Sequence, residues 1–309
     1  MAALVENMFS VRETPWHGLG TIVADAPTSA DAIRLAGLDW TVDPKDVYDA
    51  RGMKIPGYVA NTRSSDEKVL GIVTTRYRVV QNSDAFAFTD SLIGGEVHYE
   101  TAGSLCGGKK VWLLAKLPDV EIAGDKVDPY VCFMNTHDGS GAVRVCMTPV
   151  RVVCNNTLNL ALSTAQRQWS VRHTASVEQR VNEARDVLGM ADVYLKNLAD
   201  AADKLTNVTV NTELLESVLN RLFPVEDTES EKAKNNAETQ REQFIVAYNM
   251  PDIKKFYGTA WGVINAAADM AGHAEPLRRT KNFDENRFDS IVTGSRLLDM
   301  TAELVGAAA

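Results

Sequence analysis

The chain has 309 residues, of which 45% are hydrophobic, and its formal net charge at pH 7 is −9. This length allows one large or two modest domains. No apolar run reaches the roughly eighteen residues of a membrane span and the N-terminus lacks the pattern of a secretory signal, so we expect a soluble, intracellular protein. The negative charge argues against a nucleic-acid partner unless basic side chains are segregated in one groove.

The N-terminal part of the chain begins with a polar arm and a glycine turn, W-H-G-L-G-T at residues 16–21. Ser29 is placed to cap a short helix over 30–35. From residue 40 onward, β-branched and aromatic residues separated by turn clusters predict a series of strands. The predicted strands cover about 40–49, 56–62, 69–80, 96–102, 110–117, 129–135 and 142–154, with a helix over 83–93 between the third and the fourth.

Two arginines share one face of the predicted strand over 69–80. Arg76 and Arg78 alternate with Tyr77 and Val79, which is the two-residue period of a half-buried strand. The arginine face is either a solvated outer face or a row of phosphate-binding side chains, and both interpretations stay open.

Residues 103–109 match G-x-x-x-x-G-K by spacing but not by context. A phosphate loop needs a Ser or Thr next and then a helix, whereas Lys110 and a strand-like apolar run follow here. We therefore predict a β-hairpin turn with Lys109 and Lys110 at its tip, a position from which lysines can contact a nucleic-acid backbone.

The stretch over 136–162 is the most distinctive of the chain, because a polar turn with glycines leads into a β-rich run and then a helical segment. No Asp or Glu occurs from Gly139 to Val177. The same window contains the arginines Arg144, Arg151, Arg167 and Arg172. An acidic chain has thus kept one long segment free of negative charge.

His137 and Asp138 suggest a metal hydrolase, but the other histidines do not have the spacing of further ligands. The alternative is a turn in which Asp138 accepts hydrogen bonds from backbone amides ahead of Gly139. No G-x-S-x-G, H-E-x-x-H or paired Cys/His signature occurs. We therefore predict no catalytic residue, no metal ion and no cofactor.

The cysteines have no C-x-x-C pair and lie in apolar or strand-like surroundings. Buried free thiols in a reducing compartment are expected rather than disulfides or a zinc site. The cysteines concerned are Cys106, Cys132, Cys146 and Cys154.

A resemblance to a known family is carried by E-T-A-G-S-L-C-G-G-K-K-V-W, T-H-D-G-S-G-A-V-R-V, T-P-V-R-V-V-C-N-N-T-L-N-L-A-L and the later V-R-H-T. These strings resemble the phage- and plasmid-related family of domain of unknown function 932, and the similarity extends from W-H-G-L-G to about Leu205. The family name carries no activity. The family is also similar, more distantly, to phage single-strand annealing proteins, in which a helix packs across a β-sheet and subunits form rings; this second resemblance is an analogy rather than a match of residues.

Beyond Thr174 the sequence becomes helical. A capping-box pattern at Ser176 and Gln179 begins a helix over 176–205, whose apolar stripe packs either on its own sheet or against another subunit. The stripe comprises Val177, Val181, Ala184, Leu188, Ala191, Leu195, Leu198, Ala202 and Leu205. Further elements are a helix over 212–223, a charged connector or solvated helix over 226–242, and helices around 261–271 and 285–305.

We predict an α+β fold, in which a twisted, mainly antiparallel sheet has helices packed on one face and a helical C-terminal region follows. The predicted core covers 1–205 and includes the long helix over 176–205. The predicted helical region covers 206–309 and includes the charged connector. Strands first and helices later argue against a doubly wound nucleotide fold.

Three functions are compatible with these observations. The first is a phage-type protein that binds single-stranded DNA and promotes annealing in recombination or replication, as a homo-oligomer in the cytoplasm of a bacterial host. The second is a non-enzymatic structural or host-takeover protein that binds other proteins through the helix over 176–205 and an acidic surface. The third is a hydrolase or nucleotide-binding enzyme that uses His137 and Asp138. We favour the first, with no enzymatic activity and no membrane partner.

For the favoured function, cationic side chains are expected to contact the DNA backbone and aromatic rings to stack on bases. The predicted nucleic-acid-binding residues are Arg76, Arg78, Lys109, Lys110, Arg144, Arg151, Arg167 and Arg172. The predicted stacking residues are Tyr77, Trp112 and Trp169. The expected assembly is a closed ring of subunits.

Overall fold

The fold was analysed in a computed structural model. It describes residues 5–11, 21–23, 28–86, 98–151, 156–157, 167–174, 186–225, 230–280 and 294–307, with 283, 286 and 290. The chain divides into two compact units. The first consists of Met1–Pro118, Tyr130–Met147 and Gln168–Ala191, and the second of Asp119–Pro129, Thr148–Arg167 and Asp192–Ala309. The sequence predicts one core over 1–205, whereas the second unit contains residues 119–129, 148–167 and 192–205 of that range.

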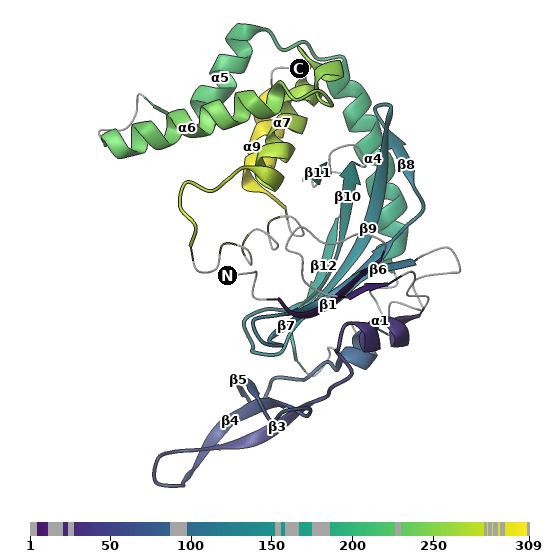
Figure 1. The fold of residues 1–309 in the computed structure, drawn as a ribbon, viewed down its shortest axis with the longest axis vertical. Coiled ribbons are helices and arrows are strands. Elements are labelled where there is room, and N and C mark those ends of the chain that lie inside the picture. Colours follow the sequence, from purple (N-terminus) through teal and green to yellow (C-terminus); the bar gives the residue numbers. More distant parts are fainter. Residues whose placement is uncertain are drawn as a thin grey trace. The chain divides into compact units, whose positions relative to one another are not determined.

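Most strands belong to one sheet, with the order β11-β10-β9-β7-β6-β1-β2, in which β12 also pairs with β10 and β8 with β9 (Figure 1). The pair β1 and β2 is parallel, and the other described pairings are antiparallel. The predicted α+β class with a mainly antiparallel sheet is therefore confirmed. The strands are β1 Val5–Val11, β2 Thr21–Val23, β6 His98–Leu105, β7 Lys110–Lys116, β8 Val120–Ile122, β9 Asp125–Thr136, β10 Val143–Arg151, β11 Asn156–Thr157 and β12 Gln168–Val171.

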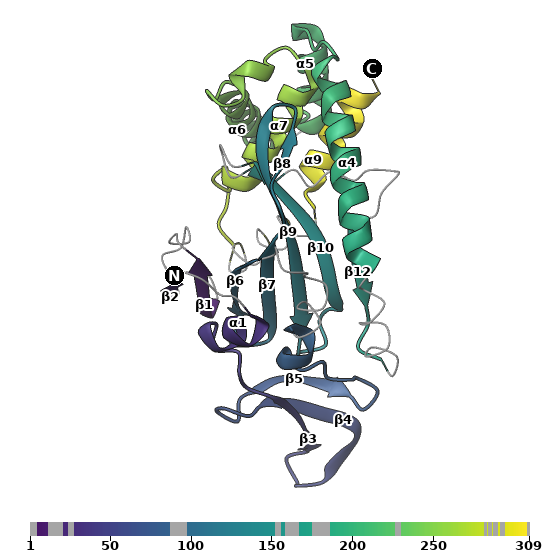
Figure 2. The ribbon, with the colours of Figure 1, turned by 90° about the vertical axis from the view of Figure 1, so that its right-hand side faces the viewer.

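A second sheet has three strands in the order β3-β4-β5: β3 Val42–Tyr48, β4 Lys54–Arg63 and β5 Val69–Thr74 (Figure 2). Its inner face lies against the turn that follows β9. Asn61 Nδ2 donates a hydrogen bond of 2.7 Å to the carbonyl of His137. Gly71 has no room for a side chain, because a Cβ there would come within 2.5 Å of Asp138 Cα. This close approach makes glycine necessary at position 71.

Several elements differ from their prediction for identifiable reasons. The predicted polar arm contains β1, which pairs with β6 in the large sheet. The predicted strand over 69–80 ends at Thr74, where the Tyr77 amide donates back to the Thr74 carbonyl in a turn. The helix α1, Ser29–Leu35, is capped by Thr28, whose hydroxyl accepts from the Asp31 amide, and not by Ser29. The glycine turn at residues 16–20, and the predicted helix over 83–93 beyond residue 86, lie outside the described residues.

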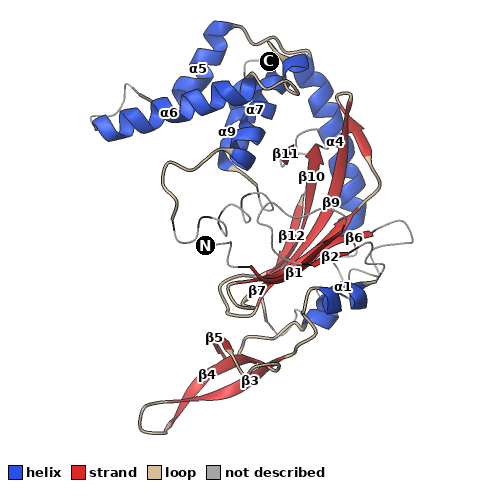
Figure 3. Cartoon of the chain, in the orientation of Figure 1, coloured by secondary structure: helices blue, strands red, loops and turns tan. Residues whose placement is uncertain are grey.

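The helices follow in the C-terminal part of the chain (Figure 3). In the second unit, α7 is buried nearly all round, with Trp261, Val263 and Ile264 fully inside, and it contacts α6 and α9. A helix that is apolar on every side belongs in the centre of a helical cluster. The helices are α4 Asp186–Thr206, α5 Thr212–Leu222, α6 Glu231–Tyr248, α7 Ala260–His273 and α9 Arg296–Gly306, with the short 3-10 helix η1 Lys254–Phe256.

The apolar stripe predicted for the long helix is present in the described part of α4. Ala191, Leu195, Leu198 and Ala202 are buried within the single chain. Their burial favours packing on the chain itself over a contact between subunits. The earlier stripe residues, up to Leu188, lie outside the residues whose side chains are described. The charged segment over 226–242 is a mostly exposed helix from Glu231 onward.

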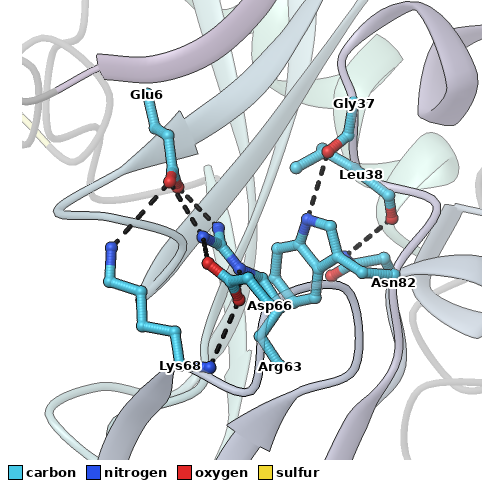
Figure 4. Close-up of polar contacts among 8 residues, drawn as sticks. Glu6, Gly37, Leu38, Arg63, Asp66, Lys68 and Asn82 are labelled. Carbon is cyan, nitrogen blue, oxygen red and sulfur yellow. Dashed lines mark hydrogen bonds and ion pairs between the residues drawn. The ribbon is translucent and has the colours of Figure 1, made fainter.

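The cluster around Arg63 ties the small sheet to β1 (Figure 4). The guanidinium is only 8% exposed and donates hydrogen bonds to Glu6, at 2.6 and 2.9 Å, and to Asp66, at 2.6 and 2.8 Å. It also lies 5.6 Å from the centre of the Trp40 ring. Its hydrogen bonds lower the pKa of the Glu6 carboxyl and lower the pKa of Asp66 to about 2. Both carboxylates are therefore ionised at neutral pH.

Replacing Arg63 with methionine should lower the free energy of unfolding by about 2 kcal/mol, because several charge-assisted hydrogen bonds are lost and the carboxylates are only partly solvated. Urea unfolding at pH 7 measures this loss. Since the carboxyl pKa values are lowered, the wild-type advantage should shrink as pH falls from about 4 toward 2. Arg34→Met is the matched control, since Arg34 forms one exposed pair with Asp31 and should change stability by less than about 0.5 kcal/mol. Equal losses in the two variants would contradict a structural role for the Arg63 cluster.

Candidate functional site

An open cleft of about 610 Å³ lies in the first unit, where three segments distant in sequence meet. One segment follows β5, another is the β9–β10 loop with the start of β10, and the third follows β12. The cleft is lined by Thr74, Arg76, Tyr77, Gly139, Ser140, Gly141, Ala142, Arg144, Arg172, His173 and Thr174.

Backbone pairing fixes two walls of this cleft. In the register of β10 and β12, Arg144 lies opposite Ser170, and Arg172 follows Ser170 by two residues on the same face. The segment after β5 is joined to the end of β12, because the Arg78 amide donates to the His173 carbonyl at 3.1 Å. Arg76, Arg144 and Arg172 are thereby placed around one opening.

The β9–β10 loop is shaped by Asp138 and Gly139. The Asp138 carboxylate accepts a hydrogen bond of 2.9 Å from the Ser140 amide, as predicted for this turn. Gly139 has a φ of +78°, which favours glycine, and a Cβ there would lie 3.0 Å from the Val73 side chain. The carboxylate of Asp138 thus stabilises its own loop by this hydrogen bond. The residues of the loop that line the cleft include Gly139, Ser140 and Gly141.

The three cleft arginines have no acidic partner among the described residues. Arg76 and Arg172 are exposed and Arg144 is half-buried, and none of them forms an ion pair or side-chain hydrogen bond with a described residue. The residues that line the cleft include no Asp or Glu. Three guanidinium groups around one opening favour a positive potential there, although the net charge of the protein is −9.

Tyr77 and His173 form a fixed wall of the cleft. Their rings stack with centres 4.4 Å apart, and the Tyr77 hydroxyl donates to the Thr136 carbonyl. His173 Nδ1 lies 2.9 Å from the Arg78 carbonyl, which can only accept, so Nδ1 carries the proton. Burial lowers the pKa of His173 and raises that of Tyr77, so both are neutral at pH 7.

His137 and Asp138 are adjacent in sequence but point to different surroundings. His137 is fully buried, with Nε2 at 3.0 Å from Asn82 Oδ1 and its ring 5.4 Å from that of Trp40. Desolvation, with a smaller contribution from nearby His173, lowers the pKa of His137 to about 3. Among the described residues, no three His, Cys, Asp or Glu side chains are grouped so that they could hold a metal ion. The geometry gives the metal-hydrolase alternative no support.

Of the predicted binding residues, the structure brings together Arg76, Tyr77, Arg144 and Arg172 in the cleft. Arg78 is exposed but does not line the cleft. Lys109 and Lys110 are half-buried at the predicted hairpin turn, where the Lys109 carbonyl accepts from the His137 amide. Arg167 belongs to the second unit, and the side chain of Arg151 lies outside the described residues.

Of the three predicted stacking residues, Tyr77 lines the cleft and Trp112 and Trp169 do not. Trp112 is buried beneath Gly103, where a Cβ would come within 2.5 Å of the indole, so its ring has no face for a base. Trp169 is half-buried on β12, opposite the buried Val145. Tyr77 lines the cleft, but one face of its ring is already covered by His173.

Sequence reasoning missed the contribution of Thr74, His173 and Thr174 to the cleft. His173 has no neighbouring motif, and its role depends on contacts with residues almost a hundred positions away. The available signal was the acid-free window, which contains every cleft residue after Asp138.

The cysteines agree with expectation where they are described. Cys132 and Cys146 are buried free thiols, and Cys106 is a half-buried free thiol. Cys154 lies outside the described residues.

Comparison with known proteins gives one match. The model of a family described as domain of unknown function (DUF932) matches residues 69–292, which include the whole cleft. No curated protein and no solved structure matches the chain. None of the described helices is long and apolar enough to cross a membrane.

Proposed function

We propose that this chain, which belongs to the family of domain of unknown function DUF932, binds single-stranded DNA in the cleft and acts as an annealing protein. The observation that carries the proposal is the convergence of Arg76, Arg144 and Arg172 on one cleft, where none of them is paired with a carboxylate of a described residue. Unpaired guanidinium groups bind phosphate oxygens with paired hydrogen bonds, and phosphate contacts supply the sequence-independent part of nucleic-acid affinity.

The remaining lining fits a backbone-binding role. The Gly139–Gly141 loop lets a ligand approach the main chain closely. A protein that promotes annealing must hold the backbone and leave the base edges free to pair. Arginines with few base-reading groups meet this requirement.

Three phosphate contacts in one chain give modest affinity, and repetition of the cleft around a homo-oligomer would raise it by avidity. A homo-oligomer, in the form of a ring, therefore remains part of the proposal. The alternative function, binding of other proteins through the long helix, is less favoured. The stripe residues Ala191, Leu195, Leu198 and Ala202 of α4 are buried by the chain itself.

Fluorescence anisotropy with a labelled oligothymidine tests the proposal. Three phosphate contacts to a single strand predict a slope of log affinity against log salt of about −2, so the affinity should fall about twentyfold between roughly 50 and 200 mM salt. A thymine oligomer with a neutral peptide backbone is the matched control and should not bind. Absence of oligothymidine binding at low salt would exclude the proposed function.

A further inference from the structure

On the outer face of the small sheet, the neighbouring strands β4 and β5 expose three apolar side chains. Tyr58, Val69 and Ile72 are 47%, 52% and 60% exposed, whereas Leu70 and Val73 of the same sheet are buried. A two-sided sheet with one packed face usually carries polar residues on the other. This face departs from that pattern at three neighbouring positions.

The strand register places the three side chains together. Across β4 and β5, Tyr58 lies opposite Thr74, Ala60 opposite Ile72, and Thr62 opposite Val69. The register shifts between Asn61 and Thr62, and this bulge leaves Leu70 inside and Val69 outside. Residues that alternate along a strand share a face, so the partners of the exposed apolar side chains across β4 and β5 are all uncharged. On the other side of β4, the same face carries Asp43 opposite Thr62 and Lys45 opposite Ala60.

This outer face is continuous with the cleft. Thr74 both lines the cleft and is the direct cross-strand partner of Tyr58. Directly opposed side chains have Cβ atoms about 5 Å apart. The exposed ring of Tyr58 therefore lies beside the residue at which the arginine-lined cleft ends.

A single strand presents two chemically different sides, charged phosphates and flat, uncharged bases. The cleft suits the first and the exposed side chains of Tyr58 and Ile72 suit the second, because bases stack on aromatic rings and pack on apolar side chains. We propose that the outer face of β4 and β5, with Tyr58 as the stacking residue, takes the bases of the strand whose phosphates lie in the cleft. This inference rests on the proposed function and assigns the base contacts to residues other than Tyr77, Trp112 and Trp169.

Tyr58→Ala tests the inference in two binding measurements at one salt concentration. Affinity for oligothymidine should fall about fivefold to a hundredfold, which corresponds to the loss of one or two stacked bases. Affinity for an abasic oligodeoxynucleotide of the same length should not change, because it offers phosphates without bases. Tyr58→Phe should retain binding, since the ring and not the hydroxyl is required.

Tyr48→Ala is the matched control, because Tyr48 is 57% exposed on the same sheet but pairs with Lys54 at the end away from Thr74. It should bind like wild type. If wild type binds oligothymidine and Tyr58→Ala binds it equally well, the inference is overturned while the proposed function stands. If Tyr58→Ala instead lowers the molar mass measured by light scattering without changing DNA affinity, the face is a contact between subunits and the inference is again overturned. Failure of wild type to bind removes the proposed function itself.

Discussion

Replacing Arg76, Arg144 and Arg172 together with glutamine should weaken oligothymidine binding at least about a hundredfold at low salt, since each charge-assisted contact to phosphate contributes on the order of 1 kcal/mol or more. None of the three guanidinium groups is paired with a described acid. Their removal therefore takes away no ion pair and relieves mutual repulsion within the cleft. The melting temperature should stay the same or rise slightly. Anisotropy titration and thermal unfolding of the same samples measure both effects.

Arg51→Gln is the matched control for charge. Arg51 is exposed in the β3–β4 turn of the same unit and does not line the cleft. One substitution removes one charge, so Arg51→Gln is compared with each single cleft variant as well as with the triple variant. The control should bind within about twofold of wild type, since distant surface charges are screened by salt. Equal affinities of the triple variant and the control would show that the cleft is not the binding site.

Acidification should destabilise the protein through His137. Its pKa is about 3 in the folded protein because the imidazole is buried, against about 6.5 in the unfolded chain. Between these values the unfolded state binds a proton that the folded state does not. The free energy of unfolding should therefore fall as pH drops from about 6.5 toward 3, by about 1.4 kcal/mol per pH unit from this residue. His173, whose pKa is also lowered by burial, adds a contribution of the same sign.

The variant His137→Gln separates this effect from other acid-sensitive groups. It should be less stable than wild type at pH 7, because the contact with Asn82 and the packing on Trp40 are altered. Its stability should decline less steeply than that of wild type between pH 6.5 and about 4, the window in which His137 is neutral only in the folded state. Identical slopes for wild type and His137→Gln, measured by urea unfolding at several pH values, would contradict the account of the buried histidine.

Local sequence patterns predicted the strands that alternate clearly and the turns that contain glycine. The hairpin over Gly107-Gly108 and the Asp138 turn follow from residues within a few positions of each other. β1 was not predictable in this way, because Glu6 and Asn7 interrupt its apolar pattern. Its place in the sheet depends on pairing with β6, about ninety residues away, and on the contact of Glu6 with Arg63.

The sequence likewise indicated some residues of the candidate site and not others. The acid-free window indicated Arg144 and Arg172, since charge segregation is visible in composition. Arg76 was indicated only as one of two equivalent strand positions. The end of β5 at Thr74 and the link from Arg78 to His173 decide that Arg76 lines the cleft and Arg78 does not. Whether Arg76 or Arg78 lines the cleft depends on hydrogen bonds between distant segments, and the spacing of residues in the sequence does not indicate these bonds.

Aromatic residues were the least predictable part. Composition identifies rings but not their exposure, so Trp112 and Tyr58 are equivalent candidates until packing is known. Gly103, directly opposite on the neighbouring strand, has no side chain, and the Trp112 indole packs over it. Tyr58 stays outside because the inner face of β4 is the one that meets the turn at His137.

The difference in salt dependence between wild type and the Arg76/Arg144/Arg172→Gln variant tests the central claim most directly. Log affinity for oligothymidine is measured against log salt for both proteins, at salt concentrations where both bind detectably. If the three arginines contact phosphates, the wild-type slope should be more negative than that of the variant by about two units, because each lost contact to a single strand removes about 0.7. Parallel slopes for the two proteins would contradict the claim that this cleft holds the backbone of a single strand.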